Sequence, residues 1–321
     1  MDRIDKILEN LNERQLEAVK TTEGYVRVIA GAGSGKTKAL TSRYAYIVEG
    51  LGINSSNILC VTFTNKAAQE MKNRVKNLIG QNIDLSYITT YHGFCVRVLR
   101  EDINKVQYPK SFVIMDVEDQ KTLLRQIFSE LNLSQTDCTF KEVLRFISSQ
   151  KSSLSYLENM MEGKIENTKT VFDEIFLAYL FKQQKNFALD FDDLINFAIY
   201  IFDKSKETLE KWQKRLHYIQ VDEAQDSSDK QFGLVSLLAD YHKNLFIVGD
   251  PDQTIYEWRG ARPEILVDFD RVFKNSRTII LSQNYRSTPE ILNLANQIIK
   301  KNKIRVDKDL FTLNPERSEE H

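Results

Sequence analysis

A glycine-rich loop between a strand pattern and a helix pattern is the feature that most limits how this chain can fold. The loop is Ala30-Gly31-Ala32-Gly33-Ser34-Gly35-Lys36-Thr37, and it follows the apolar stretch Tyr25-Val26-Arg27-Val28-Ile29. Small residues let successive backbone N–H groups converge on phosphate oxygens, at a helix N-terminus whose dipole favours anions. Lys36 supplies a mobile positive charge, and the Thr37 hydroxyl can ligate Mg²⁺. The loop predicts a nucleotide-binding site, although Ala30 replaces the first glycine of the usual pattern G-x-x-x-x-G-K-[ST].

Length and charge set wide bounds on the rest. With 321 residues the chain exceeds the usual size of one domain, so about two domains with sizeable cores are expected. The formal net charge is −1, and a polyanion would therefore have to be bound by a local groove. Three scattered cysteines form no zinc or disulfide pattern, no apolar run approaches the roughly 20 residues of a membrane span, and the N-terminus lacks a signal-peptide core. We expect a cytoplasmic protein with reduced cysteines and no membrane segment.

Alternating strand and helix patterns predict an α/β fold with a parallel sheet. The expected elements of the first third are helix 6–20, strand 25–30, helix 36–50, strand 57–63, helix 65–79 and strand 86–90. Residues 92–212 are mostly helical in pattern, as in Leu123-Leu124-Ile127-Phe128-Leu131. Strand patterns return at 218–221, 245–248 and 278–281. The helical block therefore looks inserted into one discontinuous α/β domain.

An acidic segment follows the first returning strand. In Val221-Asp222-Glu223-Ala224-Gln225-Asp226, Asp222 is the candidate Mg²⁺ ligand and Glu223 the candidate base that takes a proton from an attacking water. Acidic residues after a strand can also be an ordinary solvated turn. Paired with the phosphate loop, the two adjacent acids favour hydrolysis over transfer to a small acceptor.

A third segment, residues 248–260, mixes an amide, aromatic rings and a cation. Gln253 could contact the terminal phosphate, while Tyr256 and Trp258 offer flat faces on which bases can stack. Core packing is the alternative for the two aromatic residues.

Seven segments now stand in order along the chain: Leu11–Gln15, Ala30–Thr37, Val61–Ala68, Thr89–Phe94, Asp222–Asp226, the segment around Gln253, and Gln283–Ser287. Together they resemble the motifs in the N-terminal half of a superfamily 1 DNA helicase of the UvrD/Rep/PcrA type. The resemblance covers nearly the whole chain and implies a RecA-like P-loop NTPase sheet with an inserted, mostly helical domain. It also makes Ala30 a normal member of the phosphate loop.

The resemblance assigns roles to residues of both ligand sites. ATP would be contacted by Gln15, Ala30, Gly31, Ala32, Gly33, Ser34, Gly35, Lys36, Thr37 and Tyr285. Hydrolysis would depend on Lys36, Glu223, Gln253 and Arg286, and Mg²⁺ would be held by Thr37 and Asp222. Single-stranded DNA would be contacted by Phe63, Thr64, Asn65, His92, Tyr256, Trp258 and Arg259. The implied partners are ATP, Mg²⁺, single-stranded DNA and single-strand/duplex junctions.

The same resemblance implies a domain division. Residues 1–106 and 192–280 would form the ATP-binding lobe (1A), residues 107–191 the inserted helical domain (1B), and residues 281–321 the start of a second RecA-like lobe (2A). The segment Asp190-Phe191-Asp192-Asp193-Leu194 is also similar to a signature of the family, and we expect it to cap a helix.

The chain departs from the family in its length. No segment that resembles the remaining second-lobe motifs follows Arg286, so we expect an N-terminal portion of a 3′–5′ helicase that is inactive as a motor by itself. Two other functions remain open: the helicase part of a nuclease-fused recombination enzyme, and an ATP-dependent single-strand-binding module.

Overall fold

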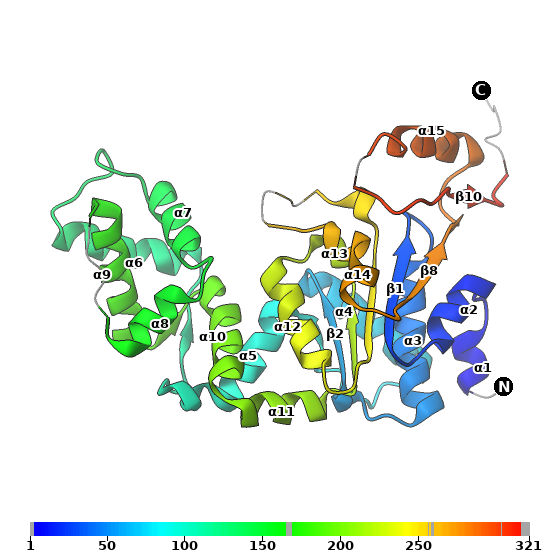
Figure 1. Cartoon of the computed structure of the whole chain (residues 1–321), viewed down its shortest axis with the longest axis horizontal. Helices are drawn as coiled ribbons and strands as arrows, with labels where there is room; N and C mark the ends of the chain where they lie inside the picture. Colours follow the sequence, from blue (N-terminus) through cyan, green and yellow to red (C-terminus); the bar gives the residue numbers. More distant parts are fainter. Residues whose placement is uncertain (1–2, 165–168, 256, 258–259, 303, 316–321) are drawn as a thin grey trace. The chain divides into compact units, whose positions relative to one another are not determined.

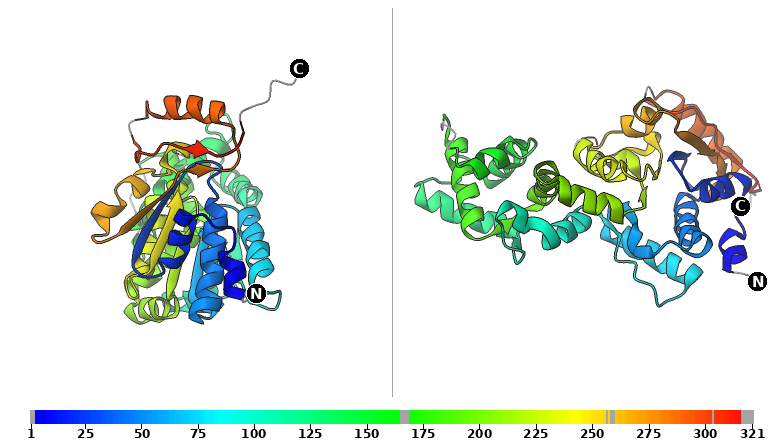
Figure 2. Two further views of the ribbon diagram at one scale, coloured as in Figure 1. Left: turned by 90° about the vertical axis from the view of Figure 1, so that its right-hand side faces the viewer. Right: turned by 60° about the horizontal axis from the view of Figure 1, so that its bottom comes forward.

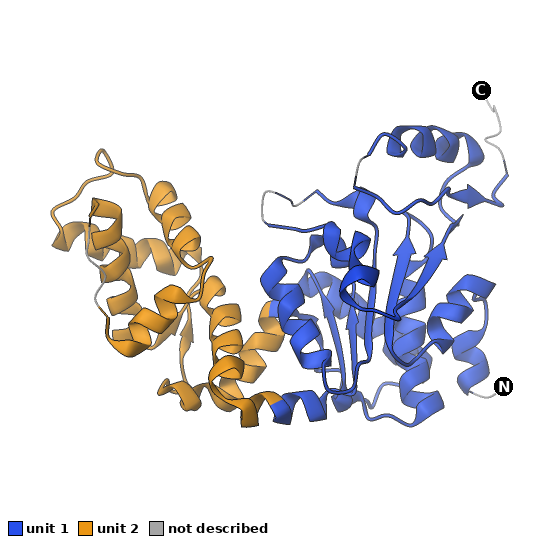
Figure 3. Ribbon diagram, viewed as in Figure 1, with its two compact units in different colours: residues 1–91, 210–321 blue, residues 92–209 orange. Residues whose placement is uncertain are grey.

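The structure of the chain is a computed structural model that describes residues 3–164, 169–255, 257, 260–302 and 304–315. It consists of two compact units: unit 1 comprises Met1–Tyr91 and Glu210–His321, and unit 2 comprises His92–Leu209 (Figure 3). Within the described part of the chain, no helix combines the length and the apolar character needed to cross a membrane.

Unit 1 is built on a six-stranded parallel sheet with the strand order β3-β2-β6-β7-β1-β8 (Figure 1). The strands are β1 (Tyr25–Ala30), β2 (Ile58–Thr62), β3 (Ile88–Thr90), β6 (Tyr218–Val221), β7 (Leu245–Gly249) and β8 (Arg277–Leu281). All residues of β2, β6 and β7 are buried, as expected for parallel strands that are covered on both faces. The predicted α/β class with a parallel sheet is confirmed.

Helices cover both faces of this sheet. In the left view of Figure 2, α3 and α4 lie on one side of the strands and α12 lies on the other. The bounds in unit 1 are α1 (Arg3–Leu8), α2 (Glu13–Lys20), α3 (Lys36–Leu51), α4 (Asn65–Ile79), α12 (Asp229–Ala239), α13 (Glu264–Val267), α14 (Phe269–Val272) and α15 (Pro289–Ile299). The helix α4 buries Ala68, Met71, Val75 and Ile79, which recur at the three- and four-residue spacing of one helix face.

Two helices stand where one was predicted over residues 6–20. The chain breaks between α1 and α2 because Asn10 adopts a left-handed backbone with φ 62°. Asn12 then caps α2: its side chain accepts a hydrogen bond from Gln15 N, and the Gln15 side chain accepts one from Asn12 N. The prediction of a continuous helix was wrong because it followed apolar spacing and ignored these asparagines.

A buried cation sits in the middle of β1. Arg27 donates hydrogen bonds to Leu266 O at 2.7 Å, to Val267 O at 2.9 Å and to Thr278 Oγ1 at 2.8 Å. The two carbonyl groups lie at the C-terminal end of α13, where a helix dipole favours positive charge. Arg27 thereby ties α13 to strands β1 and β8 of the sheet.

Residues after β8 form a small addition to unit 1. The short strand β9 (Gln283–Asn284) pairs in parallel with β10 (Phe311–Thr312), and α15 lies between them in the sequence. Single-turn 3₁₀ helices occupy Ser55–Asn57, Ala224–Asp226 and Pro251–Gln253. The last two directly follow the acidic residues at the ends of β6 and β7.

Unit 2 is mostly helical, as predicted for this part of the chain. Its elements are a 3₁₀ helix (Ile103–Val106), β4 (Val113–Ile114), α6 (Val117–Glu130), α7 (Phe140–Gln150), α8 (Ser155–Glu162), α9 (Val171–Lys185), β5 (Ala188–Leu189) and α10 (Phe191–Lys204). Two further helices, α5 (Tyr91–Asp102) and α11 (Lys206–Arg215), run across its boundaries with unit 1.

Unit 2 extends beyond the predicted insertion of residues 107–191 at both ends. The reason is packing: α10 contacts β5 and the 3₁₀ helix Ile103–Val106, so residues on both sides of the predicted limits belong to one core. Residues 281–321 group with unit 1. The division into helicase lobes stays a prediction.

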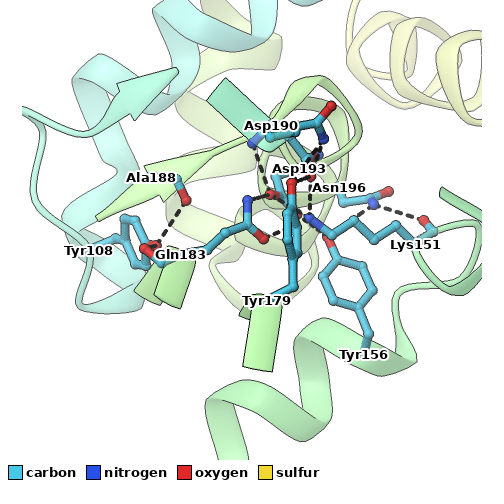
Figure 4. A network of polar contacts seen from close by, with 10 residues as sticks. Tyr108, Lys151, Tyr156, Tyr179, Gln183, Ala188, Asp190, Asp193 and Asn196 are labelled. Carbon is cyan, nitrogen blue, oxygen red and sulfur yellow. Dashed lines mark hydrogen bonds and ion pairs between the residues drawn. The ribbon is translucent and has the colours of Figure 1, made fainter. Parts of the chain in front are cut away.

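A buried lysine organises the core of unit 2 (Figure 4). The Lys151 side chain is fully buried, and its Nζ donates to Asp190 Oδ2 at 2.6 Å, to Asp193 Oδ2 at 2.8 Å and to Gln183 Oε1 at 2.9 Å. Tyr156 and Tyr179 donate their hydroxyl protons to the same two carboxylates. With the hydrogen bond from Asp193 N to Asp190 Oδ1, all four carboxylate oxygens of the two aspartates accept hydrogen bonds inside the core.

Asp190 and Asp193 also start α10. Asp190 is the N-cap and accepts from Asp193 N, while Asp193 accepts from Asp190 N, so the expected helix cap is confirmed. Burial and the charge of Asp190 raise the pKa of Asp193 to about 6. Burial acts in the same direction on Asp190, but the Lys151 ammonium and the hydrogen bonds from Asp193 N and the Tyr179 hydroxyl together outweigh it and lower the pKa of Asp190. One cation therefore compensates two carboxylates that share a buried site.

Candidate nucleotide-binding site

The predicted site residues of unit 1 meet at the carboxyl ends of the parallel strands. Lys36 follows β1, Phe63 follows β2, Glu223 follows β6 and Gln253 follows β7, and this edge is where open α/β sheets bind ligands. A pocket of about 330 Å³ lies there. Its lining residues are Thr37, Thr62, Phe63, Thr64, Ala67, Glu70, Met71, Asp222, Glu223, Gln225, Asp226, Gln253 and Ile255.

The glycine-rich loop has the turn and helix entry that a phosphate site needs. Gly33 has φ +69°, a backbone region that a residue with a side chain adopts only with strain. Ser34 Oγ donates to Gly31 O at 2.8 Å and closes the turn, and α3 begins directly afterwards at Lys36. The unpaired N–H groups of the first turn of α3 therefore point toward the loop, where they can bind an anion.

Lys36 and Glu223 form an ion pair across the site. The distance from Lys36 Nζ to Glu223 Oε2 is 2.9 Å, and Gln225 Nε2 donates to the same oxygen at 2.9 Å. Glu223 has φ 47°, a left-handed conformation that is rare for a residue with a side chain and is typical of functional sites. The strained backbone of Glu223 therefore holds its carboxylate next to the phosphate-loop lysine.

Asp222 and Asp226 present unpaired oxygen atoms. Asp222 Oδ1 and Asp226 Oδ1 are buried and have no hydrogen-bond partner within the described structure. Burial and the neighbouring charge of Glu223 raise the pKa of Asp222 to about 7, and the same two causes raise the pKa of Asp226 to about 6. An orphaned carboxylate oxygen in a pocket lined by the Thr37 hydroxyl fits a hard divalent cation, because Mg²⁺ prefers oxygen ligands.

Gln253 follows the neighbouring strand β7 and lines the same pocket. Its Nε2 donates to Asp250 Oδ2 at 2.5 Å, and Asp250 N donates to Gln225 Oε1 at 3.0 Å. Gln225 therefore bridges the loop after β7 to Glu223 after β6. The hydrogen bonds connect the amide predicted to contact the terminal phosphate with the predicted base.

Gln15 lies against the phosphate loop. Its side chain is buried, and Nε2 donates to Ser34 O at 2.9 Å while Oε1 accepts from Asn12 N at 3.2 Å. A Cβ atom at Gly35 would come within 2.5 Å of Gln15 Nε2, so the amide packs directly on the loop. Both the donor and the acceptor of the amide are used in these contacts, and its contact with ATP stays a prediction.

Tyr285 and Arg286 also lie beside the phosphate loop. Tyr285 N donates to Gly33 O at 2.9 Å, Asn284 Nδ2 donates to Ala32 O at 2.6 Å, and the Tyr285 hydroxyl accepts from Asn12 Nδ2 at 2.7 Å. Arg286 is exposed, and its backbone N donates to Asn284 Oδ1 at 2.8 Å. Residues 284–286 therefore lie next to the phosphate loop, while the contacts of Tyr285 and Arg286 with ATP stay predictions.

The residues predicted to contact DNA fall into three groups: three lie in unit 1, one lies in unit 2, and three lie outside the described residues. Phe63 lines the pocket, Thr64 caps α4 by accepting from Ala67 N at 3.1 Å, and Asn65 is exposed at the first position of α4. His92 belongs to unit 2, where its ring contacts Phe191 edge to face, and burial lowers its pKa. The remaining three lie outside the described residues: Tyr256, Trp258 and Arg259.

Sequence reasoning missed several residues that build the site. Gln225 and Asp226 stood in the acidic segment but received no role, and their amide and carboxylate character was the available signal. Asn284 accepts from Arg286 N and Ser287 N while donating to the phosphate loop, a role that only its neighbour Tyr285 hinted at.

Comparison with known proteins identifies the family. The profile described as "UvrD/REP helicase N-terminal domain" matches residues 11–274. The chain is 41% identical over 311 residues to a protein of Staphylococcus epidermidis named "ATP-dependent DNA helicase PcrA", covering 97% of this chain and 43% of the relative. It is 43% identical over 312 residues to the protein of the same name from Bacillus subtilis, covering 97% of this chain and 42% of the relative. The chain thus spans less than half the length of these relatives, and it belongs to the UvrD/REP helicase N-terminal domain family.

Proposed function

We propose that unit 1 binds ATP with Mg²⁺ and hydrolyses it, as the nucleotide-binding part of a 3′–5′ DNA helicase. The observation that carries the proposal is one pocket edge where the phosphate-loop Lys36 is paired with Glu223 and Asp222 keeps an unpaired oxygen. The phosphate-loop cation, the candidate base and the candidate Mg²⁺ ligand therefore lie together at the carboxyl ends of β1 and β6. The names of the relatives agree with this function.

Phosphate binding would change the partner of Lys36. Its ammonium, now 2.9 Å from Glu223 Oε2, would turn to the terminal phosphates, and Glu223 would be freed to accept a proton from the attacking water. Gln253 would orient that water or the γ-phosphate, and Arg286 would stabilise charge in the transition state. An arginine that contacts the γ-phosphate in this way, an arginine finger, raises the rate of hydrolysis on the order of 10³-fold or more.

Thr37 and Asp222 would hold the Mg²⁺ ion. The ion would supply charge neutralisation between the phosphate groups. Within the described residues no cluster of three or more His, Cys, Asp or Glu is arranged as a metal site. Two protein ligands completed by phosphate and water is the coordination that Mg²⁺ usually adopts at nucleotides.

Single-stranded DNA is the proposed second ligand, including its junctions with duplex DNA. Phe63, Tyr256 and Trp258 would stack on bases. The backbone of the strand would be contacted, or linked to the ATP site, by Thr64, Asn65, His92 and Arg259. Stacking contributes about 1–3 kcal/mol per base and tolerates any sequence, which suits movement along DNA. A protein with this ligand would act in the bacterial cytoplasm or nucleoid.

Movement along DNA requires two lobes that close on ATP. Unit 1 up to residue 280 would correspond to lobe 1A and unit 2 to its insertion 1B, while residues 281–321, which group with unit 1, would be the start of lobe 2A. We therefore propose that the chain alone binds ATP·Mg²⁺ weakly and does not unwind duplex DNA.

The test compares ATP hydrolysis with and without single-stranded DNA for residues 1–321, for the full-length gene product and for Glu223→Gln in both. Glu207→Gln is the matched control, because the Glu207 side chain is 88% exposed and lies in unit 2. We expect DNA-stimulated hydrolysis by the full-length protein that falls at least a hundredfold in Glu223→Gln and is unchanged in Glu207→Gln. Full-length hydrolysis that survives Glu223→Gln would show that the assigned base is wrong, and strand unwinding by residues 1–321 would refute the need for a second lobe.

A further inference from the structure

A second buried lysine lies next to the nucleotide site and has no role in the proposal above. Lys308 comes from the segment between α15 and β10, and its side chain is 2% exposed. Its Nζ donates to Asp250 Oδ1 at 2.6 Å and to Asp252 Oδ2 at 2.5 Å, and both carboxylates are as deeply buried as the ammonium. A charge in such a place costs free energy unless it is paired, so the contact is specific.

The segment that carries Lys308 is fixed on both sides. Asn296 of α15 donates to Leu310 O at 2.9 Å and accepts from Leu310 N at 3.2 Å. The Leu310 side chain packs on the phosphate loop so closely that a Cβ atom at Gly31 would come within 2.6 Å of it. Asn302 Nδ2 adds a hydrogen bond to Asp252 Oδ1 at 3.0 Å. The ion pairs of Lys308 are therefore supported by hydrogen bonds and by the packing of Leu310, which together hold this segment at the end of β7.

Hydrogen bonds run without a break from Lys308 to the phosphate-loop lysine. Asp250 accepts from Lys308 through Oδ1 and from Gln253 Nε2 through Oδ2. Its backbone N donates to Gln225 Oε1, and Gln225 Nε2 donates to Glu223 Oε2, which is also the partner of Lys36. Asp250 is the branch point, because it orients both Gln253 and Gln225.

We propose that Lys308 is a positioning residue of the nucleotide site: it locks Asp250 and thereby orients Gln253 toward the terminal phosphate. The proposal rests on the proposed function, since it needs a triphosphate in the pocket. It predicts that the chain distinguishes ATP from ADP partly through a residue that touches neither nucleotide. The residue lies in the part of the chain that follows β9, so it also links that segment to the state of the terminal phosphate.

The experiment measures dissociation constants of residues 1–321 for ADP·Mg²⁺ and for ATPγS·Mg²⁺ by isothermal titration calorimetry. In Lys308→Met we expect the preference for ATPγS over ADP to fall about fivefold or more, with ADP affinity changed less than twofold, because only the γ-phosphate contact loses its orientation. Lys308→Arg should restore most of the preference. Lys300→Met is the matched control, since Lys300 lies near by in sequence and pairs with Asp309 on the exposed surface.

A double-mutant cycle separates positioning from general stability. If Lys308 acts through Gln253, then Lys308→Met has no further effect on the preference in a Gln253→Ala background. Asp250→Asn serves as a second variant that keeps the side-chain shape if Lys308→Met does not fold, and it should lower the preference in the same way.

Failure of the positioning role and failure of the proposed function give different results in these measurements. An equal loss of ADP and ATPγS affinity, an unchanged preference, or additive effects in the cycle would each overturn the positioning role while leaving nucleotide binding intact. A wild-type chain that binds neither nucleotide would instead overturn the proposed function, and the role of Lys308 with it.

Discussion

Replacing Lys151 with methionine should destabilise unit 2 strongly. The substitution keeps an unbranched side chain of similar length but removes the only cation that Figure 4 shows beside Asp190 and Asp193. The side chains of the two aspartates are 2% and 3% exposed, so both carboxylates would be left in the core without a counter-ion. Breaking a buried ion pair in this way costs about 3–5 kcal/mol. That is a large share of the roughly 5–15 kcal/mol that stabilises a typical domain.

Urea unfolding of the two units can be followed separately. Both tryptophans of the sequence fall within residues 210–321, and Trp212 is buried against Tyr87 of unit 1, so tryptophan fluorescence is the readout for unit 1. Hydrogen exchange of peptides from α9 and α10 reports on unit 2. With a typical dependence of about 2 kcal/mol per molar urea, a loss of about 4 kcal/mol moves the midpoint of unit 2 down by about 2 M. The fluorescence midpoint should move much less.

Lys121→Met is the matched control. Lys121 is also in unit 2, but it forms a surface pair with Glu118 three residues earlier on the same helix, and such pairs contribute less than about 1 kcal/mol. If the α10 peptides of Lys151→Met open at the same urea concentration as those of Lys121→Met, the buried lysine does not compensate the two carboxylates, and the reasoning is wrong.

Further predictions concern single groups. Asp193→Asn removes the surplus negative charge in the core of unit 2. Because the folded chain raises the pKa of Asp193 from its ordinary 3.8 to about 6, protonation of Asp193 stabilises the fold. This stabilisation is fully present below pH 3.8 and is lost as pH rises through about 6. Exchange of α10 peptides should therefore slow on going from pH 7 to pH 5 in the wild type, after correction for intrinsic exchange, and should lose this dependence in the variant. Gly33→Ala places a Cβ within 2.7 Å of Asn284 Nδ2 at φ +69°, so thermal denaturation should show a loss of about 1–2 kcal/mol, and an unchanged melting temperature would contradict the geometry. Thr64→Ala removes the cap of α4 and should cost about 1 kcal/mol, whereas Thr64→Ser, which keeps the hydroxyl, should melt close to the wild type.

The local elements around the phosphate loop were predictable because each has its own signal. Apolar residues mark β1, the Lys36-Thr37 pair marks the start of α3, and strands β6, β7 and β8 follow from short apolar runs bounded by polar residues. The break between α1 and α2 was also encoded, in the capping pair Asn12 and Gln15, but apolar spacing alone hid it.

Contacts between distant segments could not be predicted. Lys308 and Asp250 are 58 residues apart, and no local pattern distinguishes this lysine from exposed ones such as Lys300. Lys151 likewise gave no signal, because a lysine is ordinarily a surface residue and its burial depends on carboxylates from α10. The residue types of the site could be read from the sequence, while the hydrogen bonds that orient them required the folded chain.

The most direct test of the central claim is a nucleotide-binding titration of residues 1–321 with a fluorescent ATP analogue, with and without Mg²⁺, in the wild type and in Lys36→Ala. Lys36 is the cation that would leave Glu223 for the phosphates, so the wild type should bind in a Mg²⁺-dependent manner and Lys36→Ala should bind at least tenfold more weakly. Lys38→Ala is the control from the same helix, because Lys38 Nζ donates to Asn10 O on the exposed surface. Equal affinity of the wild type and Lys36→Ala, or no binding by the wild type, would contradict the assignment of this pocket to a nucleoside triphosphate.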